Sequence, residues 1–183
     1  DQLGLSRQFY GFICDMTCGF CAEVRAKGFP GFRVSFAIPE NIISTETSVE
    51  MLQGSLQKYA LPPSAVSIAV SESEGTLTAS AYLQQLSDMG VNIIADDTGT
   101  GYFTAELLEN SAVRTVKIKA SRLSGDAIST AFVRSVIKLA REKKIAVCAR
   151  DVDNPQDLTA RGGFDIDLIE GIFNGRPLRD KDF

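Results

Sequence analysis

The feature that most constrains the fold is a regular alternation of short apolar runs with longer amphipathic segments. The amphipathic segments predict helices over 46–59, 78–89 and 127–142. The apolar runs predict six strands, over 32–38, 65–71, 91–95, 113–118, 145–149 and 166–169. Several runs are nearly continuous in apolar character, which is typical of parallel strands covered by helices. The sequence therefore predicts an α/β protein with a parallel sheet.

The number of strand–helix units narrows the architecture further. Six units exceed what a small flavodoxin-like sheet needs and fall short of a complete eight-stranded barrel. The chain begins with a predicted helix and finishes just after a predicted strand, as expected for a barrel without its first strands. Its 183 residues, 44% of them hydrophobic, suffice for one domain and are too few for two. We therefore expect one incomplete (βα) barrel domain over 1–183, excised from a larger protein.

Composition excludes several classes of function. Nineteen Lys and Arg against 23 Asp and Glu give a net charge of -4, without the basic surface that nucleic acids require. No stretch approaches the roughly 20 apolar residues of a membrane span, and no signal peptide is evident. The absence of histidine excludes Ser-His and Cys-His catalysis and histidine-dependent zinc sites. We expect a cytoplasmic chain whose chemistry rests on carboxylates, Lys, Cys or an oxygen-held metal.

Three of the four cysteines lie in the stretch CDMTCGFC, as Cys14, Cys18 and Cys21. Radical S-adenosylmethionine enzymes use this spacing for an iron–sulfur cluster. If residues 5–25 are helical, however, the cysteines share one helix face. The opposite face carries an apolar stripe, which we predict to face the core: Leu5, Phe9, Phe12, Ile13, Met16, Phe20 and Val24. A helix buried on two sides is the favoured interpretation, because cysteine usually behaves as a small hydrophobe; a cluster or a redox thiol site is the alternative.

The segment IIADDTGTGYFTAELL places Asp96 and Asp97 directly after a predicted strand. The carboxyl ends of barrel strands hold the chemistry, so these acids could bind a metal or act as a general base. Alternatively, one of them caps the turn by accepting backbone N–H bonds. Asp97, Thr98 and Gly99 also spell the aspartic-protease triplet, but those enzymes are all-β and need two facing carboxylates. The predicted helices argue against a protease.

Six stretches cover most of the chain in a fixed order: RVSFAIPENII, VSIAVSES, ADDTGTGY, VRTVKIKAS, IAVCARDVDNPQDL and LIEGIFNGRPL. Their order and spacing resemble the EAL domain of bacterial cyclic di-GMP phosphodiesterases, where they run approximately as VSVNLSxxxL, LELEITES, LDDFGTGYSSL, VDxIKIDxSF, VIAEGVETxxQ and QGYxFxxPL. The resemblance implies a modified (βα)8 barrel that hydrolyses cyclic di-GMP to the linear dinucleotide. Two Mg²⁺ or Mn²⁺ ions, held at the strand ends by carboxylates and an Asn, would generate the attacking hydroxide.

Residue by residue, the resemblance implies a depleted site. Ala37 replaces the family's metal-binding Asn, Ala69 and Arg150 replace metal-binding Glu residues, Lys119 replaces an Asp, and Asp153 replaces a Glu. The E-A-L signature and the phosphate-contacting Arg have no counterpart, and their strand would lie before residue 1. The remnants of the family site are Asp96, Asp97, Lys117, Glu72 and Glu170, the last in place of a Gln. The loop that couples the family site to dimerisation is kept with its Phe changed: Thr98, Gly99, Thr100, Gly101 and Tyr102.

These substitutions do not suit two divalent cations. An alanine supplies no ligand, and an arginine adds a fixed positive charge beside the ion. We therefore expect that metal binding and phosphodiesterase activity are lost and that the chain uses no cofactor. We also expect Arg150, with Lys117 or Lys119, to neutralise Asp96 and Asp97, so that a guanidinium stands in place of the metal.

The resemblance favours a catalytically inactive module with a regulatory, protein-interaction or dimerisation role in bacterial cyclic di-GMP signalling. A diguanylate cyclase (GGDEF) or sensor domain is the expected neighbour, and homodimerisation the expected assembly. We predict that the cysteine face of the first helix needs a cover from a partner or from missing chain. The first alternative is a non-hydrolysing cyclic di-GMP receptor, in which Lys117, Lys119 and Arg150 form a metal-free anion site. An active phosphodiesterase is the less favoured alternative.

Overall fold

The computed structural model describes residues 2–38, 42, 46–71, 80–98, 104–109, 112–160, 163–179 and 182. The strands are β1 (Val34–Ala37), β2 (Val66–Ser71), β3 (Asn92–Asp96), β4 (Val113–Lys119), β5 (Ala146–Arg150) and β6 (Leu168–Ile169). The helices are α1 (Gln2–Ala26), α3 (Glu46–Lys58), α5 (Ser80–Asp88), α6 (Thr104–Glu109), α7 (Ala120–Leu123), α8 (Ala127–Glu142) and α9 (Pro155–Ala160). Two 3₁₀ turns are η1 (Pro63–Ala65) and η2 (Ile172–Asn174).

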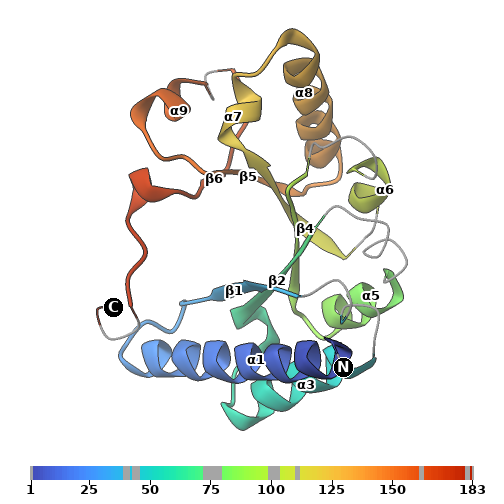
Figure 1. The fold of residues 1–183 in the computed structure, drawn as a ribbon, viewed down its shortest axis with the longest axis vertical. Coiled ribbons are helices and arrows are strands. Elements are labelled where there is room, and N and C mark those ends of the chain that lie inside the picture. Colours follow the sequence, from blue (N-terminus) through green and yellow to red (C-terminus); the bar gives the residue numbers. More distant parts are fainter. Residues whose placement is uncertain are drawn as a thin grey trace.

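The strands form one sheet in the order β1-β2-β3-β4-β5-β6, and every neighbouring pair is parallel. All six predicted strands are present, with boundaries within two residues of those expected. The sheet curls into an open half-barrel with the helices outside it, and β1 and β6 are the edge strands of the described part (Figure 1). The predicted fold class, an incomplete (βα) barrel, is confirmed.

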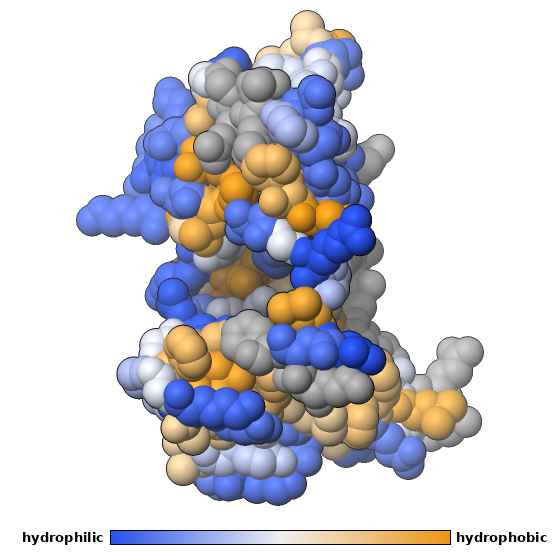
Figure 2. Space-filling view, turned by 90° about the vertical axis from the view of Figure 1, so that its left-hand side faces the viewer, coloured by the Kyte–Doolittle hydropathy of each residue, from blue (hydrophilic) through white to orange (hydrophobic). Residues whose placement is uncertain are grey.

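The two faces of the sheet carry different side chains. On the convex face, Ile68, Ile93, Val116 and Val147 are buried in the core under the helices. The concave face instead lines a cavity of about 390 Å³, whose lining combines the small polar residues Ser35, Ser67 and Thr115 with Ile94 and Lys117. Closed barrels fill this space with bulky branched side chains. In this chain the surface is hollowed between the upper and lower parts of the molecule, as the view from the open side of the half-barrel shows (Figure 2).

Helix α1 faces the core with the side opposite to the one we predicted. Cys14, Cys18 and Cys21 are fully buried, whereas Leu5, Phe9, Phe12 and Met16 are between 53% and 67% exposed. The predicted core face is therefore wrong, although Val24 of that stripe is buried and Ile13 and Phe20 are half-buried. The prediction that the cysteine face needs a cover from outside is also wrong, because this chain's own core covers it.

The reason for the inversion is the close approach of α1 to α3. Gly11 lies against Met51, and a Cβ added at Gly19 would meet the Tyr59 ring at 3.2 Å. The Tyr10 hydroxyl donates a hydrogen bond to the Ser48 carbonyl at 3.2 Å. Small residues let the two helices approach closely, and phenylalanine side chains on that face would hold them apart.

The buried cysteines are poor metal ligands and weak nucleophiles. Burial raises the pKa of the Cys14 thiol to about 12 and that of Cys18 to about 11. Thiolates rather than thiols bind metals. Within the described residues, no three His, Cys, Asp or Glu side chains form a group that could hold a metal ion. The CDMTCGFC spacing therefore reflects helical periodicity.

Candidate functional site

The candidate site lies at the carboxyl ends of the central strands. Asp96 ends β3, Lys119 ends β4 and Arg150 ends β5. The sheet register places Lys119 directly beside Arg150, and Ser71 beside Asp96. Because parallel strands finish at one edge of the sheet, charged residues far apart in sequence meet here.

Arg150 binds both acids of the Asp96–Asp97 pair. Its Nη1 lies 2.8 Å from Asp96 Oδ1 and 3.3 Å from Asp97 Oδ1. The Arg150 and Asp96 side chains are 23% and 25% exposed, so this pair is partly shielded from water. Burial lowers the pKa of Arg150, but the hydrogen bond to Asp96 and the charges of Asp96, Asp97 and Asp151 raise it above its usual value. The predicted neutralisation of the acid pair by Arg150 is confirmed.

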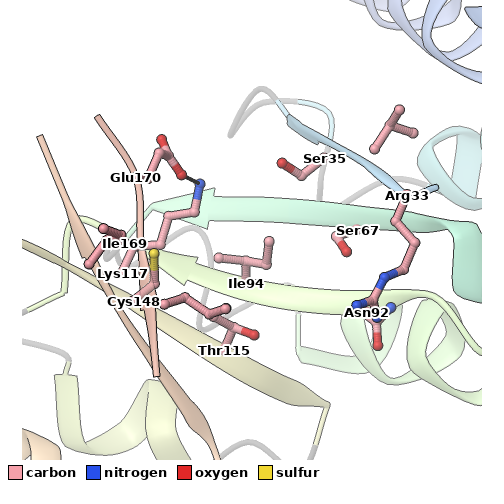
Figure 3. A pocket seen from close by; sticks show the side chains of 12 residues that line it. Arg33, Ser35, Ser67, Asn92, Ile94, Thr115, Lys117, Cys148, Ile169 and Glu170 are labelled. Carbon is pink, nitrogen blue, oxygen red and sulfur yellow. Dashed lines mark ion pairs between the residues drawn. The ribbon is translucent and has the colours of Figure 1, made fainter. Parts of the chain in front are cut away.

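Two lysines contact further carboxylates of the site. Lys119 Nζ lies 3.2 Å from Asp97 Oδ1. Lys117 projects from β4 onto the concave face, where its Nζ lies 2.5 Å from Glu170 Oε2 (Figure 3). Each of the three cations proposed for an anion site therefore already contacts a carboxylate.

The Lys117–Glu170 pair was not predicted. A sequence signal existed, because Glu170 directly follows β6 and is a carboxylate where the family has a neutral Gln. Using that signal requires the order β4-β5-β6 of the sheet, which the sequence does not state.

The turn after β3 is held by hydrogen bonds to its neighbours. Asp97 has a left-handed φ of 53°, which is uncommon outside glycine, and its N–H donates to Asp96 Oδ1 at 2.8 Å. Buried Thr98 donates twice to the Lys117 carbonyl, from Oγ1 at 2.7 Å and from its N–H at 3.1 Å. Asp96 thus caps this turn, as one of the two sequence interpretations proposed, and Thr98 ties it to β4.

The remaining predicted positions lie apart from this charge cluster or outside the described residues. Ala37 and Ala69 are partners in the β1–β2 register, and their methyl groups provide no ligand. Asp153 accepts a hydrogen bond from the Ile172 N–H at 3.0 Å and so anchors η2. Five predicted positions lie outside the described residues: Glu72, Gly99, Thr100, Gly101 and Tyr102.

The described residues do not fit a two-metal centre. A divalent cation prefers several oxygen ligands, and at this edge the two candidate carboxylates, Asp96 and Asp97, are both bound by Arg150. A cation placed between them would meet the guanidinium charge at short range, where like charges in a partly buried site repel by about 4 kcal/mol or more. The geometry therefore favours an internal ion-pair cluster over metal coordination.

None of the helices in the described part of the chain combines the length and the apolar character needed to cross a bilayer.

Comparison with known proteins identifies relatives over almost the whole chain. The family model described as "EAL domain" matches residues 1–177. The cyclic di-GMP phosphodiesterase PdeF of Escherichia coli is 31% identical over 183 residues, covering 96% of this chain and 24% of PdeF. The bifunctional diguanylate cyclase/cyclic di-GMP phosphodiesterase MucR of Pseudomonas aeruginosa is 30% identical over 186 residues, covering 97% of this chain and 27% of MucR. The chain thus spans about a quarter of the length of these curated relatives.

Solved structures share the fold at low sequence identity. The PaMucR phosphodiesterase in complex with c-di-GMP has a TM-score of 0.88 and 22% identity, with 98% of this chain and 75% of that chain covered. The EAL domain of Xanthomonas citri FimX in complex with c-diGMP has a TM-score of 0.82 and 17% identity, with 96% of this chain and 72% of that chain covered.

Proposed function

The chain belongs to the EAL domain family, and we propose that it is a catalytically inactive member with a regulatory, protein-interaction role in cyclic di-GMP signalling. The names of its relatives support the signalling context, since PdeF and MucR are both described as cyclic di-GMP phosphodiesterases. The greater length of these relatives, and the diguanylate cyclase activity in the name of MucR, support a neighbouring signalling domain.

The observation that carries the proposal is the contact of Arg150 with both Asp96 and Asp97. The family resemblance assigns a metal-binding Glu to the position of Arg150, so the substitution removes a ligand and adds a competing cation. Ala37 and Ala69 remove two further donors. Without bound metal, no group that the structure describes at this edge would lower the pKa of a water molecule enough to produce hydroxide near neutral pH.

The pairing of the cations argues against the receptor alternative. Binding a phosphate diester through Lys117, Lys119 or Arg150 would require breaking contacts to Glu170, Asp97 or Asp96. Breaking the Arg150–Asp96 pair would leave the partly buried Asp96 carboxylate without its cation, and each broken pair would subtract from the binding energy. We therefore expect weak or no binding of cyclic di-GMP.

Two measurements on the same protein test the proposal. Hydrolysis is followed by separating cyclic and linear dinucleotides after incubation with Mg²⁺ or Mn²⁺, and binding is followed by calorimetric titration with cyclic di-GMP. We expect no turnover and no binding heat. Turnover would overturn the assignment as inactive, whereas tight binding without turnover would replace the interaction role by a receptor role.

A further inference from the structure

We propose that the concave cavity contains an anion-binding site at Lys117, which the chain's own Glu170 carboxylate occupies in place of a small oxyanion such as inorganic phosphate. Lys117 Nζ lies 2.5 Å from Glu170 Oε2, and both residues line the cavity (Figure 3). The inference rests on the absence of ligand binding proposed above, because it names the residue that keeps this site closed.

The two partners of this ion pair differ in their exposure to water. The Lys117 side chain is only 12% exposed, whereas the Glu170 side chain is 55% exposed. A cation that is shielded from water needs a nearby anion, because leaving such a charge unpaired is strongly destabilising. A half-exposed carboxylate loses much less when it returns to water. The pair therefore combines a fixed cation with an exchangeable anion.

Glu170 can leave Lys117 by rotation of its side chain alone. Its N–H donates to the Ala149 carbonyl at 2.8 Å, and its carbonyl accepts from the Val152 N–H at 2.9 Å. These two bonds hold the backbone of Glu170 beside the end of β5, whichever way the side chain points. Displacement of the carboxylate therefore leaves the cavity wall intact, and an incoming anion would meet a preformed site.

The described part of the cavity wall offers no second anion for Lys117. Glu170 is the one carboxylate among the described lining residues. Cys148, the register partner of Lys117, remains a neutral thiol, because burial raises its pKa to about 11. Asp96 ends the neighbouring strand, but its Oδ1 is already held by Arg150 Nη1 at 2.8 Å. Without the Glu170 charge, Lys117 must therefore take its anion from solution.

The rest of the wall suits a small oxyanion. Thr115 lies two residues before Lys117 on β4 and so faces the same side of the sheet, and Ser35 also lines the cavity. Their hydroxyl groups can donate hydrogen bonds to an oxyanion, and Arg33 adds a second positive charge to the wall. Inorganic phosphate supplies the opposite charge and several oxygen acceptors in a small volume.

Thermal unfolding of Glu170→Gln in phosphate tests the proposal. Glutamine keeps the size of glutamate and removes its charge, so Lys117 loses its anion. If phosphate then binds with a Kd of about 1 mM, about 10 mM phosphate raises the folded-to-unfolded ratio about elevenfold. For a chain of this size, that raises the Tm by about 3–6 °C relative to chloride at equal ionic strength. The Tm of the wild type should differ by less than about 1 °C between the two salts.

Two variants separate this site from a general effect of phosphate. Glu23→Gln removes the carboxylate that pairs with Lys27, which is 58% exposed and therefore hydrated, so this variant should respond like the wild type. Lys117→Met combined with Glu170→Gln removes the cation itself, so the phosphate response should vanish. Circular dichroism verifies that each variant is folded.

Three results would overturn the proposal: no phosphate response in Glu170→Gln, an equal response in the wild type, or a response that persists in the double variant. Cyclic di-GMP is added to Glu170→Gln in a parallel experiment, and we expect no response, because the shielded Lys117 admits only a small anion. Stabilisation by the dinucleotide would overturn the restriction to small anions. Hydrolysis and binding of cyclic di-GMP by the wild type are separate measurements, so failure of this inference is distinguishable from failure of the proposed inactivity.

Discussion

Replacing Arg150 with alanine should convert the acid pair from an internal ion-pair cluster into a weak cation site. Loss of one partner costs up to about 1 kcal/mol for an exposed ion pair and about 3–5 kcal/mol for a buried one. Arg150 and Asp96 are 23% and 25% exposed, and Asp97 is 44% exposed and so largely screened by water. We therefore expect Arg150→Ala to lower the free energy of unfolding by about 2 kcal/mol, or the Tm by about 4–8 °C.

Magnesium should reverse part of this loss in the variant alone. If Asp96 and Asp97 bind Mg²⁺ with a Kd of about 1 mM, then about 10 mM Mg²⁺ stabilises the folded variant by about 1.4 kcal/mol. Thermal unfolding is measured with MgCl₂ and with NaCl at equal ionic strength, because general screening also changes surface electrostatics. The wild type should show the same Tm in both salts.

Arg179→Ala is the matched control. Arg179 pairs with Asp182 on the surface, with side chains 70% and 39% exposed, so its removal should change stability by less than about 1 kcal/mol and create no Mg²⁺ response. A wild type that Mg²⁺ stabilises as much as the variant would refute the reasoning, because it would show that Arg150 does not exclude the ion. Equal stability of Arg150→Ala and wild type would refute the assigned role of the ion pairs.

Three further results are expected. Gly171→Ala should destabilise the folded domain by at least about 3 kcal/mol, because the added Cβ would lie 2.2 Å from the Val152 carbonyl oxygen at a φ of 152°. Gly54→Ala, at an exposed position of α3, should not destabilise it. Chemical denaturation compares the two variants. Thr98→Val should cost about 1–2 kcal/mol in the same assay, because it removes the buried bond to the Lys117 carbonyl. Stability should fall as the pH rises from 9 towards 11, because burial raises the pKa of Cys18 and that of Cys148 to about 11. Unfolded thiols ionise near 9, so over this range the unfolded state binds fewer protons than the folded state. A flat denaturation midpoint between these pH values would contradict the prediction.

The strands and the central ion pair could be predicted from the sequence because each leaves a local signal. A buried parallel strand is a continuous apolar run, and its carboxyl end lies at the same sheet edge as those of its neighbours. Asp96 and Arg150 directly end two such runs, and the family resemblance, which assigns both positions to one metal site, is what pairs their opposite charges. By contrast, the bond from Thr98 to β4 depends on strand register, which the runs do not encode.

The face of α1 could not be predicted because hydrophobic patterning ranks faces by side-chain size and apolarity. Core packing also depends on how closely two helices approach, and α3 approaches α1 over Gly11 and Gly19. The face with the smaller residues therefore became the buried one, and the more apolar face remained exposed.

The ion pairs at the strand ends bear on where a regulatory signal could act on this domain. Among the described residues, the three cations Lys117, Lys119 and Arg150 contact four carboxylates, Glu170, Asp97, Asp96 and Asp151, so the carboxylates of this cluster are paired without a bound ion. An edge whose charged groups are already paired with one another gives a metal or a dinucleotide little differential binding energy with which to shift the conformation of the domain. A regulatory signal would then have to act through another surface of the domain.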